Sequence, residues 1–130
     1  MAQLDDNTRS KIEAPNFAFL ATLMKDGSPQ VSPVWIAMED GRLTFNTTVG
    51  HVKDRNIRRD PRVAISIADK ENPYEKVCIR GRVVEIVEGD EAERQIDALA
   101  KKYLGQDTYP WRNPGDARVK VVVEPESVST

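Results

Sequence analysis

The sequence predicts a mainly β fold in which six antiparallel strands curl into a small barrel, with helices across the openings of the barrel. Segments of alternating apolar and polar residues are joined by two tight turns, Lys25-Asp26-Gly27-Ser28 and Glu39-Asp40-Gly41, which are typical of β-hairpins. No series of strand–helix–strand crossovers is visible, so the sheet is expected to be mainly antiparallel. The 130 residues are expected to form one domain, residues 1–130, because that length suffices to bury a core.

The N-terminal half predicts three strands followed by a short helix. The strands are Phe17–Leu23, Gln30–Met38 and Arg42–Thr48. Pro33 lies inside the second strand, and because proline donates no ladder hydrogen bond, an edge or a bulge is expected there. Gly50 allows a turn at the start of a helix predicted over Val49–Arg59, and Asp60-Pro61 ends that helix.

The C-terminal half predicts three more strands and a longer helix. The strands are Arg62–Ala68, Lys76–Val87 and Arg118–Val123, and Gly81 is expected to mark a bulge or bend. Asp90 is predicted to cap a helix that ends near Gly105, with Glu93 completing a capping box. Apolar residues at helical spacing should be buried on one face of this helix: Ala92, Ile96, Leu99, Ala100 and Tyr103. The expected order is therefore β-β-β-α-β-β-α-β.

The composition describes a globular protein without disulfide or zinc chemistry. Charged residues make up 31% of the chain and aromatic residues 6%, and the formal net charge is -2. No apolar stretch is long enough to span a bilayer, and no secretory signal is visible, so a cytoplasmic location is expected. Cys78 alternates with Val77 and Ile79 and is interpreted as a small core residue in preference to a reactive thiol. His51 is the only histidine, which argues against a zinc site.

Five cations fall within Lys53–Arg62, in a chain that is otherwise slightly acidic. Helical spacing places Lys53 and Asn56 on the apolar stripe of the predicted helix, facing the sheet, and places Arg55 and Arg58 on another side. The run can be a solvated basic face or one wall of an anion site. A nucleic-acid surface fits poorly, because the net charge is negative and no aromatic residues alternate with the cations.

A lysine that is directed at a sheet requires a counter-charge, because an unpaired buried ammonium is costly. One source is an Asp or Glu from a neighbouring strand. The other is a ligand phosphate held by Lys53, by the hydroxyls of Thr47 and Thr48, and by backbone N–H groups of the turn at Gly50. The spacing alone leaves both open.

Several segments resemble, in their order along the chain, one known family. They are Phe19-Leu-Ala-Thr-Leu23, Asp26-Gly-Ser-Pro-Gln-Val-Ser-Pro-Val-Trp35, Phe45-Asn-Thr-Thr48, Lys53-Asp-Arg-Asn-Ile-Arg-Arg-Asp-Pro-Arg-Val63, Asn72-Pro-Tyr74, Arg80-Gly-Arg82 and Lys102-Tyr-Leu-Gly105. Together they resemble the pyridoxamine-5′-phosphate-oxidase-like superfamily, and within it the branch that uses the deazaflavin coenzyme F420. The resemblance covers nearly the whole chain and implies a six-stranded antiparallel split β-barrel of the FMN-binding type.

The resemblance implies a homodimer with two equivalent cofactor sites at the subunit interface. The flavin-like ring would lie along the backbone of Ser32, Pro33, Val34 and Trp35, and the ring and the phosphate-bearing tail would lie near Asn46, Thr47 and Thr48. The phosphate or an acidic tail would be held by Lys53 and Asn56 with Arg55 or Arg58. The other subunit would contribute Tyr74 and Arg80.

The activity that the resemblance implies is an F420-dependent oxidoreductase, which transfers hydride between the cofactor and an electron-poor small molecule such as a conjugated alkene, a quinone or a tetrapyrrole-like acceptor. F420 is favoured over FMN because its phosphodiester and polyglutamate tail offer more negative charge to the arginines. The chain ends at Thr130, before the C-terminal signature of true pyridoxamine-phosphate oxidases, which argues against a role in vitamin processing.

Two alternatives remain open: an FMN-binding oxidoreductase of the same fold, and a non-catalytic protein that binds or stores F420. No acid–base motif is evident, so no catalytic residue is named. Four aromatic residues are candidates for lining an apolar substrate pocket, although ordinary packing explains each of them equally well: Trp35, Tyr74, Tyr109 and Trp111.

Overall fold

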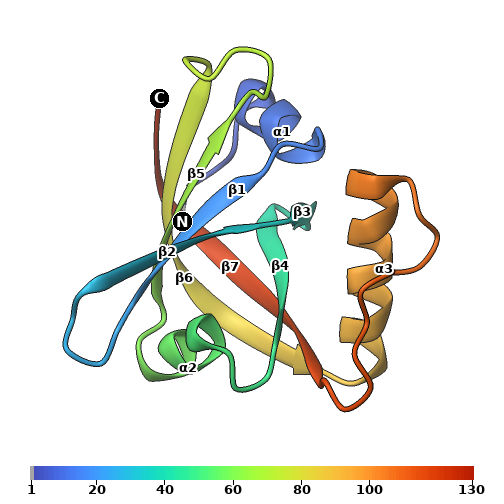
Figure 1. Ribbon diagram of the computed structural model, residues 1–130. Helices are drawn as coiled ribbons and strands as arrows, with labels where there is room; N and C mark the ends of the chain where they lie inside the picture. Colours follow the sequence, from blue (N-terminus) through green and yellow to red (C-terminus); the bar gives the residue numbers. More distant parts are fainter. Residues whose placement is uncertain (1) are drawn as a thin grey trace.

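The computed structural model of the chain describes residues 2–130 and contains a curled sheet with helices around it (Figure 1). In chain order the elements are α1 (Asp6–Glu13), β1 (Ala18–Leu23), β2 (Pro29–Val34), β3 (Ile36–Glu39), β4 (Arg42–Thr48), α2 (Val52–Arg59), β5 (Arg62–Ala68), β6 (Lys76–Glu88), α3 (Asp90–Leu104) and β7 (Arg118–Ser129). Figure 1 shows α1 and α2 at opposite ends of the sheet and α3 alongside β4. The predicted mainly β, antiparallel architecture is confirmed.

The seven strands form one sheet in the order β2-β1-β5-β6-β7-β4-β3, and every neighbouring pair is antiparallel. β2 and β3 follow each other in the chain but lie at opposite edges of the sheet. The chain therefore crosses from one edge to the other at Trp35, and the sheet must curl to allow this crossing. The predicted strand Gln30–Met38 is divided at that point, which is why there are seven strands and not six. Pro33 lies on an edge strand, as predicted.

The core lies inside the curl, and β5 follows the two-residue period of a strand. Val63, Ile65 and Ile67 of β5 are buried while the residues between them are not. In β7, by contrast, every residue from Val119 to Val123 is buried. Phe45 is the largest side chain that is fully buried. Within residues 2–130, no helix combines the length and apolarity needed to cross a membrane.

Cys78 is exposed, so its predicted place in the core is wrong. Val77 and Ile79 are buried on either side of it, and strict alternation then directs Cys78 to the outer face of β6. Its Sγ lies 3.8 Å from Ser66 Oγ on the neighbouring strand. The predicted strand is confirmed, but the side chain of Cys78 lies on the opposite face from the one expected.

The helix boundaries differ from the prediction in three places. α2 begins at Val52, so Val49 lies before the helix and is 41% exposed. The N-cap of α3 is Gly89, at a φ of 85°, and no side chain caps the helix, so the predicted Asp90 capping box is wrong. α1 was not predicted, because it buries only Thr8, Lys11 and Ile12 and presents no apolar stripe. The predicted end of α3 at Gly105, in the left-handed conformation, is confirmed.

Candidate functional site

A cleft of about 320 Å³ opens where the β2–β3 crossing, the end of β4, the start of α2 and the face of α3 meet the loop of residues 105–117. Its walls combine apolar, aromatic and cationic side chains. They are Phe17, Pro33, Val34, Trp35, Asn46, Thr47, Thr48, His51, Lys53, Ile96, Leu99, Tyr109, Trp111 and Arg118. Seven of these are sequence-predicted site residues: Pro33, Val34, Trp35, Asn46, Thr47, Thr48 and Lys53.

Two cations, Lys53 and Arg118, face this cleft, and none of the described residues that line it is Asp or Glu. Lys53 is half-buried, and its pKa is lowered first by that burial and then by the neighbouring positive charge of Arg118. Among residues 2–130, no ion pair includes either side chain. The sequence left two counter-charges open for Lys53, a carboxylate from a neighbouring strand and a ligand phosphate. Among residues 2–130, no carboxylate pairs with Lys53. The cleft carries positive charge that is not neutralised.

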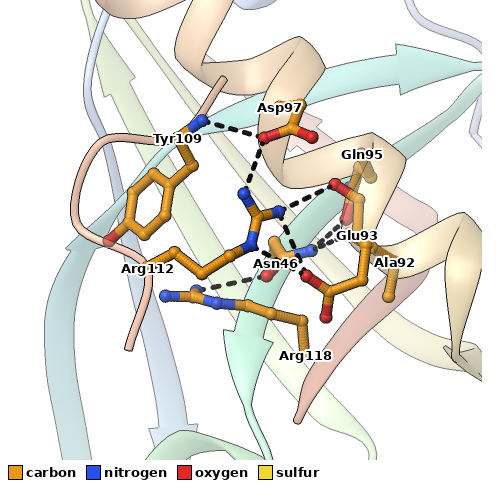
Figure 2. Close-up of polar contacts among 8 residues, drawn as sticks. All are labelled: Asn46, Ala92, Glu93, Gln95, Asp97, Tyr109, Arg112 and Arg118. Atoms are coloured by element: carbon orange, nitrogen blue, oxygen red, sulfur yellow. Dashed lines mark hydrogen bonds and ion pairs between the residues drawn. The ribbon is translucent and has the colours of Figure 1, made fainter. Parts of the chain in front are cut away.

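The end of β4 supplies the polar floor of the cleft. Thr47 and Thr48 are 3% and 5% exposed, and Thr48 pairs with Arg118 of β7 across the sheet. Asn46 donates to Ala92 O and to Gln95 Oε1, both at 2.9 Å. Its Oδ1 accepts from Arg118 Nη1 at 3.2 Å (Figure 2). Asn46 therefore uses both ends of its amide to fix the position of Arg118 relative to α3.

The start of α2 adjoins a second hollow, of about 440 Å³, that shares Lys53 and His51 with the cleft. The residues around it are Gln30, Ser32, Gly50, His51, Val52, Lys53 and Arg55. Ser32 Oγ and Gln30 Oε1 are buried there without a hydrogen-bond partner in the described chain. His51 makes no side-chain capping bond to α2, so the helix starts without a side-chain cap among residues 2–130. Such a concentration of uncompensated polar groups is typical of a ligand site.

The turn at Gly50 does not offer the free N–H groups that the sequence suggested. The Gly50 N–H donates to Asp54 Oδ2 at 2.8 Å, and the His51 N–H donates to Thr48 O at 3.1 Å. Asp54 is 2% exposed and also accepts from Arg58 Nε at 2.8 Å. The buried carboxylate thus holds the turn closed from the helix side, and the donors that remain belong to side chains and to the first turn of α2.

The loop of residues 105–117 is fixed to α3 by ion pairs (Figure 2). Arg112 contacts Glu93 Oε1 and Asp97 Oδ1, each at 3.1 Å, and Asp97 Oδ1 also accepts the Tyr109 N–H at 2.8 Å. The guanidinium of Arg118 lies 4.8 Å from the centre of the Tyr109 ring, as a cation–π contact. The loop therefore holds an aromatic side chain directly over one of the cations of the cleft.

Three aromatic rings from the β2–β3 crossing and the loop of residues 105–117 also line the cleft: Trp35, Tyr109 and Trp111. Trp35 stacks on Tyr103 with ring centres 5.3 Å apart and 8° between the planes, and it meets the edge of Tyr109 at 6.0 Å. Trp111 lies 6.4 Å from Trp35 and is 58% exposed. The cleft thus combines cations with aromatic rings, and Tyr109 contacts both Arg118 and Trp35. This combination suits a planar ligand with a negatively charged tail.

The remaining predicted site residues lie outside the cleft. Ser32 and Arg55 line the adjacent hollow. Asn56 is 1% exposed and donates to Thr22 Oγ1 at 3.0 Å, so its amide is engaged inside the protein. Arg58 pairs with Asp54. Tyr74 is 90% exposed in the loop after β5, and Arg80 lies on the outer face of β6, where its Nε donates to Ser127 Oγ.

Sequence reasoning missed Arg118, the second cation of the cleft. The sequence predicts it only as the first residue of the last strand, and nothing in its local pattern distinguishes it from a solvent-exposed strand end. The signal lies in the pairing of β7 with β4, which places it opposite Thr48. Among the described residues, no three His, Cys, Asp or Glu side chains come together.

Comparison with known proteins gives a match over almost the whole chain. The family model for pyridoxamine 5′-phosphate oxidase matches residues 4–130. A solved structure named F420 reductase is 35% identical, with a TM-score of 0.84, over 97% of this chain and 98% of that one. The conserved hypothetical protein Rv2991 from Mycobacterium tuberculosis is 25% identical, with a TM-score of 0.75, over 98% of this chain and 84% of that one. HupZ from Group A Streptococcus, at 16% identity and a TM-score of 0.68 over 97% and 92%, shares the fold.

Proposed function

We propose, from the premise that this chain belongs to the pyridoxamine 5′-phosphate oxidase family, that it is an oxidoreductase that uses coenzyme F420 to exchange hydride with an electron-poor small molecule. The observation that carries the proposal is the pair of cations, Lys53 and Arg118, which face one cleft with no carboxylate among its described walls. The similarity to a protein named F420 reductase supports the choice of cofactor.

The residues of the cleft and of the adjacent hollow fit a phosphate-bearing planar cofactor. Lys53 would bind the phosphate, and the unpartnered hydroxyl of Ser32 would donate to it. Pro33 and Trp35 would lie along the ring, where Trp35 gives a flat apolar contact. When bound, the cofactor supplies the hydride chemistry, and the protein supplies orientation and exclusion of water. No acid–base residue is assigned.

F420 is preferred over FMN because the cations occupy two adjoining places. Lys53 and Arg118 lie in the cleft, and Arg55 borders the hollow next to it, where its guanidinium contacts only Gly50 O among the described residues. One phosphate held by Lys53 and Ser32 leaves Arg118 or Arg55 without a negative partner. A phosphodiester followed by a polyglutamate tail supplies negative charge to both.

Titration with oxidised F420 and, in parallel, with FMN tests the cofactor. We expect F420 to bind more tightly, measured by quenching of its fluorescence and by calorimetry, and we expect added salt to weaken binding because the contacts are ionic. Tighter binding of FMN would favour the FMN-dependent alternative. Absence of micromolar binding by either compound would contradict the proposal.

A second measurement separates an enzyme from a binding or storage protein, because the same residues hold the ring in both. Pre-reduced F420 is mixed with the protein and a panel of conjugated alkenes, quinones and tetrapyrroles, and its reoxidation is followed by absorbance. We expect at least one acceptor to be reduced. Tight binding without turnover of any acceptor would favour the storage protein.

We further propose a homodimer formed through the outer face of β1, β2, β5 and β6. Phe19 and Val31 are 47% and 62% exposed there, and the register places them beside Pro33 and Ala21 in one apolar patch. Arg80 lies on the same face of the sheet, within a hollow of about 510 Å³. Association of two copies would cover this patch and bring Tyr74 and Arg80 towards the site of the second copy.

Val31→Glu is expected to convert the dimer to a monomer, because it places a charge within the apolar patch. Sedimentation velocity measures the change, and F420 titration shows whether the site needs both copies. The matched control is Val84→Glu, which alters an exposed valine of β6 (46%) that borders a different hollow. A wild-type protein that remains monomeric at high micromolar concentration would refute the dimer.

A further inference from the structure

At the β2–β3 crossing, both backbone groups of Ile36 are held by side chains of α3. Ile36 is the first residue of β3, at the edge of the sheet, and it directly follows Trp35. Its N–H donates to Tyr103 Oη at 3.2 Å, and its carbonyl accepts from Lys102 Nζ at 2.6 Å. Two consecutive residues of α3 therefore satisfy both backbone groups of Ile36.

The same two side chains also connect this edge to the N-terminal part of the chain. Lys102 Nζ donates to Ile12 O at 2.5 Å, at the end of α1, and Tyr103 Oη donates to Asn16 O at 2.7 Å. The two residues thus form a clamp that fixes three segments to one another: α3, the edge strand β3, and the end of α1 with the residues that follow it.

The clamp keeps an ammonium partly buried, with no carboxylate paired to it among residues 2–130. Burial lowers the pKa of Lys102 to about 8, and the charge of Glu13 offsets this only in part. A buried ammonium without a paired carboxylate is an expensive way to join two segments.

The ring of Tyr103 lies flat against Trp35, at 8° between the planes, and Trp35 lines the cleft. Tyr103 thus determines both the position of the backbone after Trp35 and the plane of its indole. We infer that Lys102 and Tyr103 are positioning residues, which set the orientation of the Trp35 wall against which a planar ligand binds. The inference rests on the proposed function only in taking the ligand of the cleft to be planar.

Tryptophan fluorescence tests the orientation of Trp35 without any ligand. Because the sequence has two tryptophans, Trp111→Phe leaves Trp35 as the only tryptophan, and excitation at the red edge of the absorption band selects it over the tyrosines. Two variants are made in this background. Lys102→Met keeps a long, unbranched side chain but removes the charge, and Tyr103→Phe keeps the stacked ring but removes the hydroxyl. Lys101→Met is the matched control, because Lys101 is exposed and pairs only with Asp107.

We expect Lys102→Met and Tyr103→Phe to shift the Trp35 emission to longer wavelength and to increase its quenching by acrylamide, while Lys101→Met leaves both unchanged. In the Trp111-containing protein, each clamp variant should bind oxidised F420 about fivefold more weakly, as expected for one net hydrogen bond. If both variants fold and their Trp35 emission matches the control, the residues are structural anchors only, and the inference is overturned. Should the wild type fail to bind F420, the proposed function fails, whereas the ligand-free fluorescence still decides the inference.

Discussion

Lys53→Met is expected to bind coenzyme F420 about 10–100-fold more weakly than the wild type, and yet to melt at a higher temperature when no ligand is present. The first effect is the loss of a charge-assisted contact to an anion. The second follows because Lys53 is half-buried beside Arg118 with no carboxylate partner, so the folded protein holds two like charges at a cost. Calorimetric titration and thermal unfolding measure the two effects on the same samples.

The difference in stability between Lys53→Met and the wild type should change with pH in a direction that can be measured. The pKa of Lys53 is lowered from 10.5 in the folded protein, so between the lowered pKa and 10.5 the unfolded chain binds more protons than the folded one. Stability contributed by this group therefore increases as the pH rises through that window. The difference in melting temperature between Lys53→Met and the wild type should become smaller there, while F420 binding to the wild type should weaken as the ammonium loses its proton.

The matched control is Arg59→Ala. Arg59 belongs to the same basic run, but its guanidinium donates to Leu23 O and Asn56 Oδ1 and faces neither the cleft nor the adjacent hollow. We expect F420 affinity to remain within twofold of the wild type, apart from the loss of general electrostatic attraction. An equal loss for both variants would mean that the run acts as a diffuse positive surface, and the assignment of Lys53 to an anion site would then be wrong.

Much of the fold can be predicted from the sequence because the strands carry their own period. The alternation in Arg62–Ala68 and the turn at Asp40-Gly41 identify β5 and the β3–β4 hairpin without reference to tertiary contacts. The break at Trp35 cannot be predicted in this way, since residues on both sides are strand-like and only the closure of the sheet separates them. The face to which Cys78 points is likewise decided by the register between strands.

In the candidate site, too, the features that depend on local sequence can be predicted and those that depend on tertiary contacts cannot. Helical phasing correctly directed Lys53 inwards, because it depends on residues within one turn. It did not distinguish Lys53 from Asn56, whose neighbours Thr22 and Met24 come from β1 and the residue after it and occupy its amide. Arg118 and the clamp of Lys102 and Tyr103 depend on contacts that span 66 to 90 positions, or on strand pairing, and no local pattern encodes them.

Gly81→Ala is expected to destabilise the protein by about 3 kcal/mol and to lower its melting temperature by roughly 10 °C. A Cβ at this position would lie 2.4 Å from the carbonyl oxygen of Glu124 and 3.0 Å from a methyl of Val123, both on β7. The nearest obstacle is backbone, so it cannot move aside as a flexible side chain could. The register of β6 against β7 shifts between Arg80 and Gly81, which confirms the predicted bulge and explains why the two backbones come so close.

Two controls separate this steric cost from other effects of replacing a glycine. Gly115 has a φ of 94° with open space around it, so Gly115→Ala should cost only the strain of that conformation, about 1 kcal/mol. Cys78→Ala changes an exposed residue of the same strand and should leave the unfolding free energy nearly unchanged. Denaturant unfolding compares all three. If Gly81→Ala were no more destabilising than Gly115→Ala, β6 and β7 could separate at the bulge without cost. The direction in which the Arg80 side chain points, one residue before Gly81, would then not depend on the close packing of β6 and β7.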